Sequence, residues 1–435
     1  MADEVGAWTL NQLNSIVEHH RSTDGPYRDL LHSSGIADDW PLMSISDMER
    51  LPMTDKEFLR ENSFPTAIRS VEPVVVVSTS GTTSSAAPVP HTRSSLDAGL
   101  GDNFGRALLI GGAGLPAKPW LVGHWDADAT DRSVSLTGSY LSMAWLDQIL
   151  EGNTLLRNGL ENPCKLVEEA AAYRPGFVAS SPNLLANLAR EAEATGITFD
   201  TKTLLYGGAA ASSSHRSRWS RVFNPERVIA FYPTTDAGAI GVSAMDNGVY
   251  ETFTETHFVE ILNEQGVHVD IGERGQVAVT AFRSRAAPLI RYCVGDAATY
   301  EGVKNNRVVI SSIERSSDAA VGDTLVPLEV ISGWAQCLRS QGFGVDAAQL
   351  ACRTDSGGRD IPVVRLFGAD HSQALEDSAL SLLWDLPQLC HEMDEGSISA
   401  PRVEYLRSSG LRGRFKVAPF VNERMKQPNR GVQTR

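Results

Sequence analysis

The 435-residue chain has few cysteines, and none of them lies close to another in the sequence. The five are Cys164, Cys293, Cys337, Cys352 and Cys390. An odd number at such wide spacing argues against a disulfide framework, and the paired spacing of a structural zinc site is missing. We therefore expect reduced thiols and a cytoplasmic protein.

Positive charge is also scarce, because 39 Lys and Arg stand against 53 Asp and Glu, a formal net charge of −14. Nucleic acids and anionic membranes bind clustered basic side chains, so we expect neither as a partner. The N-terminus, Met1-Ala2-Asp3-Glu4, lacks the pattern of a secretory signal. The most apolar window, residues 107–125, is interrupted by glycine, proline and lysine, so we expect strand and turn there rather than a membrane span.

Length and patterning indicate an α/β protein of more than one domain. A chain of 435 residues exceeds one ordinary core. From about residue 70, strand-like runs alternate with helical ones; for example, a run at 177–181 precedes a helical segment at 182–190 that has proline in its first turn. This alternation predicts mainly parallel sheets.

Shorter strand-like runs at 258–262, 276–280 and 307–310 predict a β-rich subdomain next. The small polar stretch Arg315-Ser316-Ser317-Asp318 is a candidate hinge. We expect a large N-terminal domain over 1–315 and a small α+β C-terminal domain over 316–435.

The most informative segment is the β-branched run 74–77, which ends in hydroxyl residues around Gly81. A buried strand followed by small side chains presents backbone N–H groups and hydroxyls that suit a polyphosphate, although an ordinary turn has the same composition. The loops at 207–214 and 232–238 repeat this composition. Since parallel strands end at one edge of a sheet, we expect the three loops to lie near one ligand.

The loop at 232–238 carries the most chemistry, in Tyr232, Thr234, Thr235 and Asp236. An aromatic ring stacks on a base, hydroxyls bind phosphate, and a carboxylate holds Mg²⁺ together with substrate phosphates. The alternative is that Tyr232 belongs to the core and Asp236 caps a helix. Asp296, after Gly295, has two interpretations as well: a turn cap, or an acceptor for a ribose diol.

In this order the motifs resemble those of the adenylate-forming (acyl-activating) enzyme superfamily, and within it the phenylacetate–CoA ligase-like branch, over residues 27–419. The matching segments are 51–62 before the phosphate loop, the phosphate loop Ser80-Gly81-Thr82-Thr83, 181–185 beside the acyl pocket, Gly207-Gly208 beside adenine, Tyr232-Pro233-Thr234-Thr235-Asp236, Arg291-Tyr292-Cys293-Val294-Gly295-Asp296, and the hinge with 327–330.

The resemblance implies an ATP- and Mg²⁺-dependent ligase that activates a small carboxylic acid as an acyl-adenylate. A mobile C-terminal domain then allows transfer of the acyl group to a thiol, with CoA as the default. An amine or a carrier protein as acceptor and a catalytically degenerate nucleotide-binding homologue stay open as alternatives. Members of the branch often form dimers, and nothing in the sequence contradicts a homodimer.

The resemblance also implies residue roles. The phosphate loop, Ser80 to Thr83, holds the β- and γ-phosphates; Thr234 and Thr235 bind the nucleotide and its α-phosphate, and Asp236 binds Mg²⁺. The adenine lies beside Tyr232, Gly207 and Gly208, and the ribose is held by Asp296 and Arg315. The acid is bound by His124, Ser181 and Ala209, and Arg414 or Lys416 acts in adenylation.

Four departures from the family pattern affect these roles. The phosphate loop lacks its usual lysine, and His91 and Arg93 are the nearest candidates to replace that charge. Ala209-Ala210 stands where the branch often has Glu-Pro, and Asp236 stands for a glutamate. The C-terminal lysine is replaced by Arg414, whose planar guanidinium is not equivalent to an ammonium, so Lys416 is the alternative.

Overall fold

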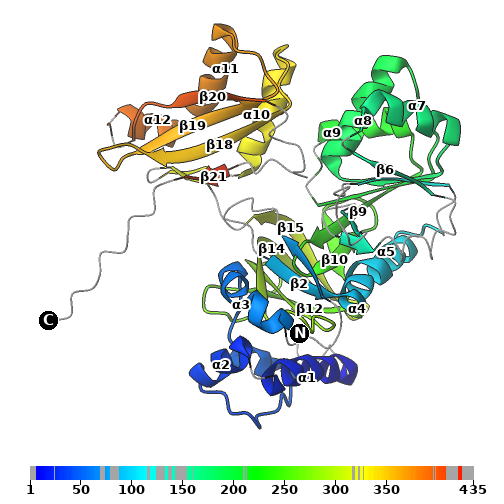
Figure 1. Cartoon of the computed structure of the whole chain (residues 1–435), viewed down its shortest axis with the longest axis vertical. Helices are drawn as coiled ribbons and strands as arrows, with labels where there is room; N and C mark the ends of the chain where they lie inside the picture. The colour runs from blue at the N-terminus through cyan, green and yellow to red at the C-terminus, as the bar shows by residue number, and fades with distance from the viewer. Residues whose placement is uncertain are drawn as a thin grey trace. The chain divides into compact units, whose positions relative to one another are not determined.

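The computed structural model describes most of the chain in two compact units, one up to Arg315 and one from Ala319 onward (Figure 1). The described residues are 6–23, 25–68, 74–78, 88–114, 118–123, 133–135, 140–142, 154–159, 161–208, 211, 213–315, 319–321, 324–326, 328–394, 396, 398–407 and 420–423.

The N-terminal segment is helical, as the sequence predicts. Its elements are α1 (Ala7–Ser22), α2 (Pro26–Ser33), the 3-10 helix η1 (Ile45–Arg50) and α3 (Lys56–Ile68). On α1, Leu13, Ile16 and Val17 are buried, a spacing that places them on one helix face. Leu13 and Val17 pack in a cluster that includes Phe258 of the first unit's sheet and Ile290 from the segment before its strand at 292–304, so this N-terminal segment is part of the first unit.

One eleven-stranded sheet organises the first unit, in the order β12-β13-β14-β15-β11-β10-β9-β8-β7-β3-β6. Its strands are β3 (Pro119–Gly123), β6 (Leu155–Asn158), β7 (Phe177–Ser180), β8 (Thr203–Gly207), β9 (Arg227–Thr234), β10 (Gly238–Ser243), β11 (Val249–Thr252), β12 (His257–Leu262), β13 (Arg274–Ala281), β14 (Tyr292–Lys304) and β15 (Arg307–Arg315). One half of the sheet, from β6 to β9 in sheet order, is parallel. The other half, from β9 to β12 in sheet order, is antiparallel throughout. The predicted parallel core and the predicted β-rich subdomain are therefore two halves of one mixed sheet.

Helices cover both faces of the parallel half (Figure 1). Helices α7 (Pro163–Tyr173), α8 (Pro182–Thr195) and α9 (Ser213–Phe223) pack on one face through a cluster around Trp120 and Trp219. Helix α5 (Asn103–Ile110) packs on the other face through Phe104 and Leu108. It follows α4 (Arg93–Leu96) and the π-helical turn η2 (Asp97–Asp102).

The expectation of strand and turn over 107–125 is therefore correct only in part. Strand β3 is present, but residues 107–110 belong to α5, because the apolar residues around them follow a helical spacing. Among the described residues, no helix has an apolar stretch of the length that a membrane span requires.

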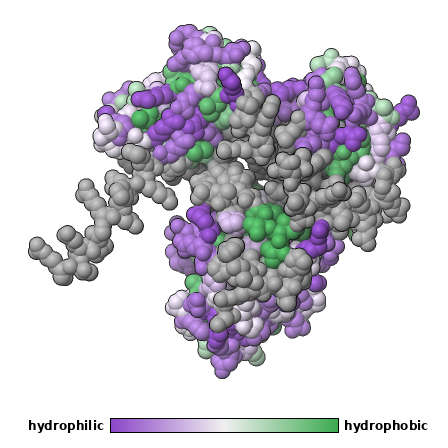
Figure 2. Space-filling model, in the orientation of Figure 1, coloured by the Kyte–Doolittle hydropathy of each residue, from purple (hydrophilic) through white to green (hydrophobic). Residues whose placement is uncertain are grey.

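The run at 74–77 is a strand, as predicted, but the prediction that this strand is buried is correct only in part. It forms β1 (Val74–Ser78), which among the described residues pairs antiparallel with β2 (Pro88–Thr92) in a two-stranded ribbon separate from the eleven-stranded sheet. Val77 is buried and Val76 is 56 % exposed, and Figure 2 shows a hydrophobic patch over this ribbon. A second small ribbon consists of β4 (Ser133–Ser135) and β5 (Tyr140–Ser142).

The second unit is an α+β domain, as predicted. Its sheet has the order β20-β19-β18-β21, and a short hairpin precedes it. Its elements are β16 (Ala319–Val321), β17 (Thr324–Val326), α10 (Leu328–Ser340), β18 (Ala347–Thr354), β19 (Asp360–Phe367), α11 (Gln373–Trp384), α12 (Pro387–Asp394), β20 (Arg402–Leu406) and β21 (Phe420–Asn422). Leu350 and Leu366 of the sheet and Leu338 and Leu383 of the helices are fully buried in its own core.

Candidate functional site

The predicted loop at 232–238 is a tight hairpin turn between β9 and β10. Thr234 pairs with Gly238, so the loop proper is Thr235-Asp236-Ala237. Gly238 has φ of 80°, and the Thr234 hydroxyl oxygen accepts a hydrogen bond from the Ala237 N–H at 3.0 Å. Three-residue hairpin loops characteristically end in a glycine in this left-handed conformation. The alternative that Asp236 caps a helix is wrong, because a strand follows it.

Two tyrosine–carboxylate contacts join this turn to strand β14. The Tyr232 hydroxyl donates to Asp296 Oδ2 at 2.8 Å, and the Tyr292 hydroxyl donates to Asp236 Oδ2 at 2.6 Å. All four side chains are buried, and burial together with the Asp236 carboxylate raises the pKa of Tyr292 well above its usual value. The residues proposed for Mg²⁺ and for ribose, Asp236 and Asp296, are therefore each held by a buried tyrosine hydroxyl where the turn meets β14.

Asp296 lies inside a strand rather than in the turn that its Gly-Asp pattern predicts. Strand β14 continues through it, and a β-bulge interrupts the pairing with β13 between Gln276 and Ala278. Gly295 has φ of 82° in this bulge. Bulges redirect a side chain, and here the redirected carboxylate meets Tyr232. On the other side of β14, Asp296 is the cross-strand partner of Arg315, the last residue of β15.

Gly207 ends strand β8 next to β9. A Cβ atom at Gly207 would lie 2.8 Å from the Phe231 carbonyl oxygen, so only glycine allows this close approach. Gly208 follows with φ of 81°. This pair therefore lies beside the strand that carries Tyr232, as its predicted place near the base requires.

Ser181 begins helix α8 as predicted. It is the N-cap, and its hydroxyl accepts a hydrogen bond from the Leu184 N–H at 3.5 Å. Ser181 is 2 % exposed and is followed by a proline in the first helical turn. Capping explains the serine at this position without any ligand.

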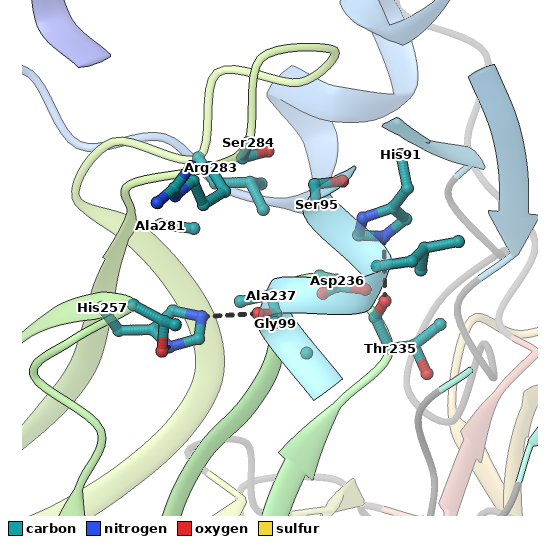
Figure 3. Close-up of a pocket in the computed structure, with 14 residues that line it drawn as sticks. His91, Ser95, Gly99, Thr235, Asp236, Ala237, His257, Ala281, Arg283 and Ser284 are labelled. Atoms are coloured by element: carbon teal, nitrogen blue, oxygen red, sulfur yellow. Dashed lines mark hydrogen bonds between the residues drawn. The ribbon is translucent and has the colours of Figure 1, made fainter. Parts of the chain in front are cut away.

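Two buried histidines and the turn itself line a cavity (Figure 3). His91 Nε2 lies 3.3 Å from the Thr235 carbonyl oxygen, and His257 Nε2 lies 2.7 Å from the Ala237 carbonyl oxygen. Burial lowers the pKa of each imidazole to about 4. Both rings are therefore neutral at pH 7, and His91 cannot replace the charge of the missing phosphate-loop lysine.

Arg291, the first residue of the Arg-Tyr-x-x-Gly-Asp motif, contacts other parts of the chain. Its guanidinium is buried, lies 3.2 Å from Glu260, and donates to the carbonyls of Leu51 at 2.9 Å and Gly266 at 2.6 Å. Burial raises the pKa of Glu260, and the guanidinium opposes that shift. Arg291 thus ties the N-terminal segment to the sheet.

The remaining predicted site residues lie outside the described residues. They are Ser80, Gly81, Thr82, Thr83, His124, Ala209, Arg414 and Lys416.

The donor set of the turn fits a Mg²⁺ ion that is held largely by substrate. The described residues contain no group of three or more His, Cys, Asp or Glu side chains that would enclose a metal. Mg²⁺ commonly takes one or two carboxylates and completes its shell with water and phosphate oxygens. Asp236 offers one such carboxylate, so the chemistry is consistent with this ion.

The structure adds two residues to the site that the sequence did not assign there, Tyr292 and His257, and it gives His91 a contact with the turn that differs from its predicted role as a replacement charge. Tyr292 lies inside the Arg-Tyr-x-x-Gly-Asp motif, but its separation from Asp236 in the sequence gives no sign that the two side chains are in contact. His91 and His257 are lone histidines next to apolar runs, which is common for core residues. A tyrosine or histidine that pairs across 20 or more positions has no local pattern.

No protein-family model and no curated protein sequence matches this chain. Solved structures do match it. The fold is that of the adenylate-forming ligases.

Three of these structures illustrate the likeness. A 2-hydroxyisobutyryl-CoA ligase in the postadenylation state, in complex with R3-HIB-AMP, has a TM-score of 0.65 and 16% identity over 95% of this chain and 89% of that one. The same enzyme with 2-HIB-AMP and CoA in the thioesterification state has a TM-score of 0.61 and 17% identity over 96% and 89%. The AtGH3.15 acyl acid amido synthetase in complex with 2,4-DB has a TM-score of 0.59 and 14% identity over 94% and 91%.

Proposed function

We propose that this protein is an ATP-dependent ligase that activates a small carboxylic acid as its acyl-adenylate and transfers the acyl group to a thiol, with CoA as the first candidate. In the first step a carboxylate oxygen of the acid bonds to the α-phosphorus of ATP, and pyrophosphate leaves. In the second step the thiol sulfur bonds to the acyl carbon, AMP leaves with the bonding electrons, and the thiol proton passes to solvent.

The observation that carries the proposal is the pair of contacts at one place in this fold, Tyr232 with Asp296 and Tyr292 with Asp236. A nucleotide has a base, a diol and phosphates within one molecule, so its site must bring unlike groups together. The turn supplies hydroxyls and a carboxylate, and β14 supplies a second carboxylate. The fold of the solved ligases supports the same assignment.

Within the proposal, the first unit binds ATP and the acid. Thr235 and Thr234 bind the nucleotide phosphates, Asp296 accepts from the ribose hydroxyls, and Asp236 is the protein ligand for Mg²⁺. The ion supplies positive charge against the phosphates when it is bound. The chain's own part is to fix these groups before the reaction, which is how fixed charges and dipoles lower the barrier of phosphoryl chemistry.

The remaining assignments complete the same proposal. The phosphate loop at 80–83 holds the β- and γ-phosphates, Gly207 and Gly208 lie beside the adenine, and Arg315 leads from the ribose to the hinge. The second unit moves between the two steps and brings Arg414 or Lys416 to the reaction. We keep the cytoplasmic location as a prediction from the cysteine pattern, and the homodimer as one from the family resemblance.

The test begins with the purified full chain, ATP, Mg²⁺ and a panel of carboxylic acids. Acid-dependent pyrophosphate release is expected with at least one acid, and AMP release should then increase when CoA is added. No release with any acid in a broad panel would contradict the proposal. Omitting the acid and omitting Mg²⁺ are the controls.

An amine is the second candidate acceptor, because one similar structure is an acyl acid amido synthetase. The same assay with a panel of amines and a carrier protein distinguishes the two. Full turnover with CoA alone would exclude the amine. The missing phosphate-loop lysine favours a third candidate, a nucleotide-binding homologue without activity; any acid-dependent exchange of pyrophosphate above background excludes it.

A further inference from the structure

The turn that carries Asp236 is held through its backbone by two side chains from distant parts of the chain. His91 comes from β2 and His257 begins β12. Their Nε2 atoms contact the carbonyl oxygens of Thr235 and Ala237, which are the residues on either side of Asp236. In Figure 3 the two rings approach the turn from opposite sides.

A relay of hydrogen bonds sets the protonated nitrogen of His257. A carbonyl only accepts, so Nε2 carries the proton that goes to the Ala237 oxygen at 2.7 Å. In a neutral ring Nδ1 is then an acceptor, and it lies 2.9 Å from the Thr256 hydroxyl. The buried Asn103 amide donates to that same hydroxyl oxygen at 2.7 Å, and the Thr256 proton is shared between Nδ1 and the Phe253 carbonyl oxygen at 3.2 Å. The donor direction is thus fixed at His257 Nε2 and at the Asn103 amide.

His91 makes the matching contact at the other carbonyl. Its ring is 5 % exposed, and by the same argument Nε2 donates to the Thr235 oxygen at 3.3 Å. The ring belongs to β2, the ribbon strand that follows the predicted phosphate loop. One imidazole therefore links that ribbon to the turn, and the other links the antiparallel half of the sheet to it.

We propose that His91 and His257 are positioning residues that hold the Thr235–Asp236–Ala237 turn by its two carbonyls and so fix the Asp236 carboxylate for Mg²⁺ and ATP. The inference rests on the proposed function for its effect on activity. It does not assign either histidine a contact with substrate. The same hydrogen bonds should also restrict the motion of the turn, and this second expectation can be tested whether or not the protein is active.

The test compares leucine and glutamine at each position. Leucine fills the space without a donor, whereas the glutamine amide nitrogen reaches the place of Nε2. In His91→Leu and His257→Leu, the Mg²⁺ concentration for half-maximal pyrophosphate release is expected to rise about fivefold to tenfold, since a lost hydrogen bond to a buried carbonyl is worth about that factor. His91→Gln and His257→Gln should stay within about twofold of the wild type.

His20→Leu is the matched control. His20 is also a buried imidazole whose Nε2 contacts a carbonyl oxygen, that of Ser284 at 2.8 Å, but it does not contact the turn. It should lose thermal stability like the other two leucine variants without a change in the Mg²⁺ requirement. An unchanged Mg²⁺ requirement in both His91→Leu and His257→Leu would overturn the inference.

Deuterium uptake by the backbone of residues 233–240, measured on the whole protein without ligands, decides the matter if no acid supports activity. If the wild-type protein is inactive, that result contradicts the proposed function but not the positioning role of the two histidines. Faster uptake in the leucine variants than in the glutamine variants and His20→Leu supports the positioning role. Equal uptake in all five variants would overturn it.

Discussion

Asp296 and Tyr232 show how single side chains define this site. The carboxylate is 7 % exposed and accepts from the Tyr232 hydroxyl, so its position is set before any ligand arrives. The ring of Tyr232 also packs against Tyr250 with centroids 6.0 Å apart. The interpretation of Tyr232 as a core residue and its predicted place beside the nucleotide are compatible.

Removal of this contact should weaken ATP use. In Tyr232→Phe the KM for ATP is expected to rise at least about tenfold, because a hydrogen bond to a carboxylate is worth about 1.5–3 kcal/mol. Asp296→Ala should lose at least as much in pyrophosphate exchange. Tyr250→Phe is the control for a hydroxyl lost from the neighbouring ring, and equal KM values in all three variants would refute the assignment.

Arg291 leads to the opposite expectation, although it lies in the same motif. Its guanidinium faces Glu260 in the interior, so Arg291→Met leaves a carboxylate buried without its partner. The free energy of unfolding should fall by about 3–5 kcal/mol in urea titrations. The double variant Arg291→Met/Glu260→Met should recover a large part of this loss. A loss in the double variant equal to that in the single one would contradict this account.

At the scale of elements, the β9–β10 hairpin and the turn η2 meet at Gly238. This glycine has φ of 80°, and a Cβ atom there would lie 3.0 Å from the Gly99 carbonyl oxygen in η2. The hairpin can keep its place only if position 238 has no side chain. This hairpin therefore couples the candidate site to the turn η2, which leads into helix α5.

Gly238→Ala should destabilise the first unit and slow the reaction. The left-handed conformation alone costs about 1–2 kcal/mol for alanine. Gly248→Ala is the matched control, because Gly248 has φ of 78° with open space around its Cβ position. Pyrophosphate release and urea unfolding should show a larger loss in Gly238→Ala than in Gly248→Ala; equal losses would mean that contact with η2 is unimportant.

At the scale of the whole molecule, buried histidines make the folded state sensitive to acid. Burial lowers the pKa of His20 to about 3 and those of His91 and His257 to about 4. The unfolded chain binds protons at these positions below about pH 6.5, whereas the folded chain does not until near pH 4. Stability is therefore full above pH 6.5 and decreases as the pH falls toward 4.

Each of these histidines should lower the free energy of unfolding by about 1.4 kcal/mol per pH unit in that window. Urea midpoints at pH 7.5, 6.0 and 5.0 measure the slope. His20→Gln should reduce the slope by the share of one group while keeping a donor to the Ser284 carbonyl. A slope in His20→Gln identical to the wild-type slope would show that this ring is protonated in the folded state.

The amino-acid sequence by itself determined the class of fold and the order of its parts. Alternating strand and helix patterns, the proline at the start of α8, and the left-handed glycine at 208 reflect local rules of backbone geometry, so they are visible one segment at a time. The turn at 235–237 was also found in this way, by its hydroxyls and carboxylate.

Tertiary structure alone decided how these segments meet. The two tyrosine–carboxylate pairs join residues 64 and 56 positions apart, and the separate β1–β2 ribbon and the bulge at Gly295 depend on pairing between strands. A polar side chain has the same sequence signature at a surface turn and in a buried network. The difference lies in the desolvated partner, which the fold supplies from elsewhere in the chain.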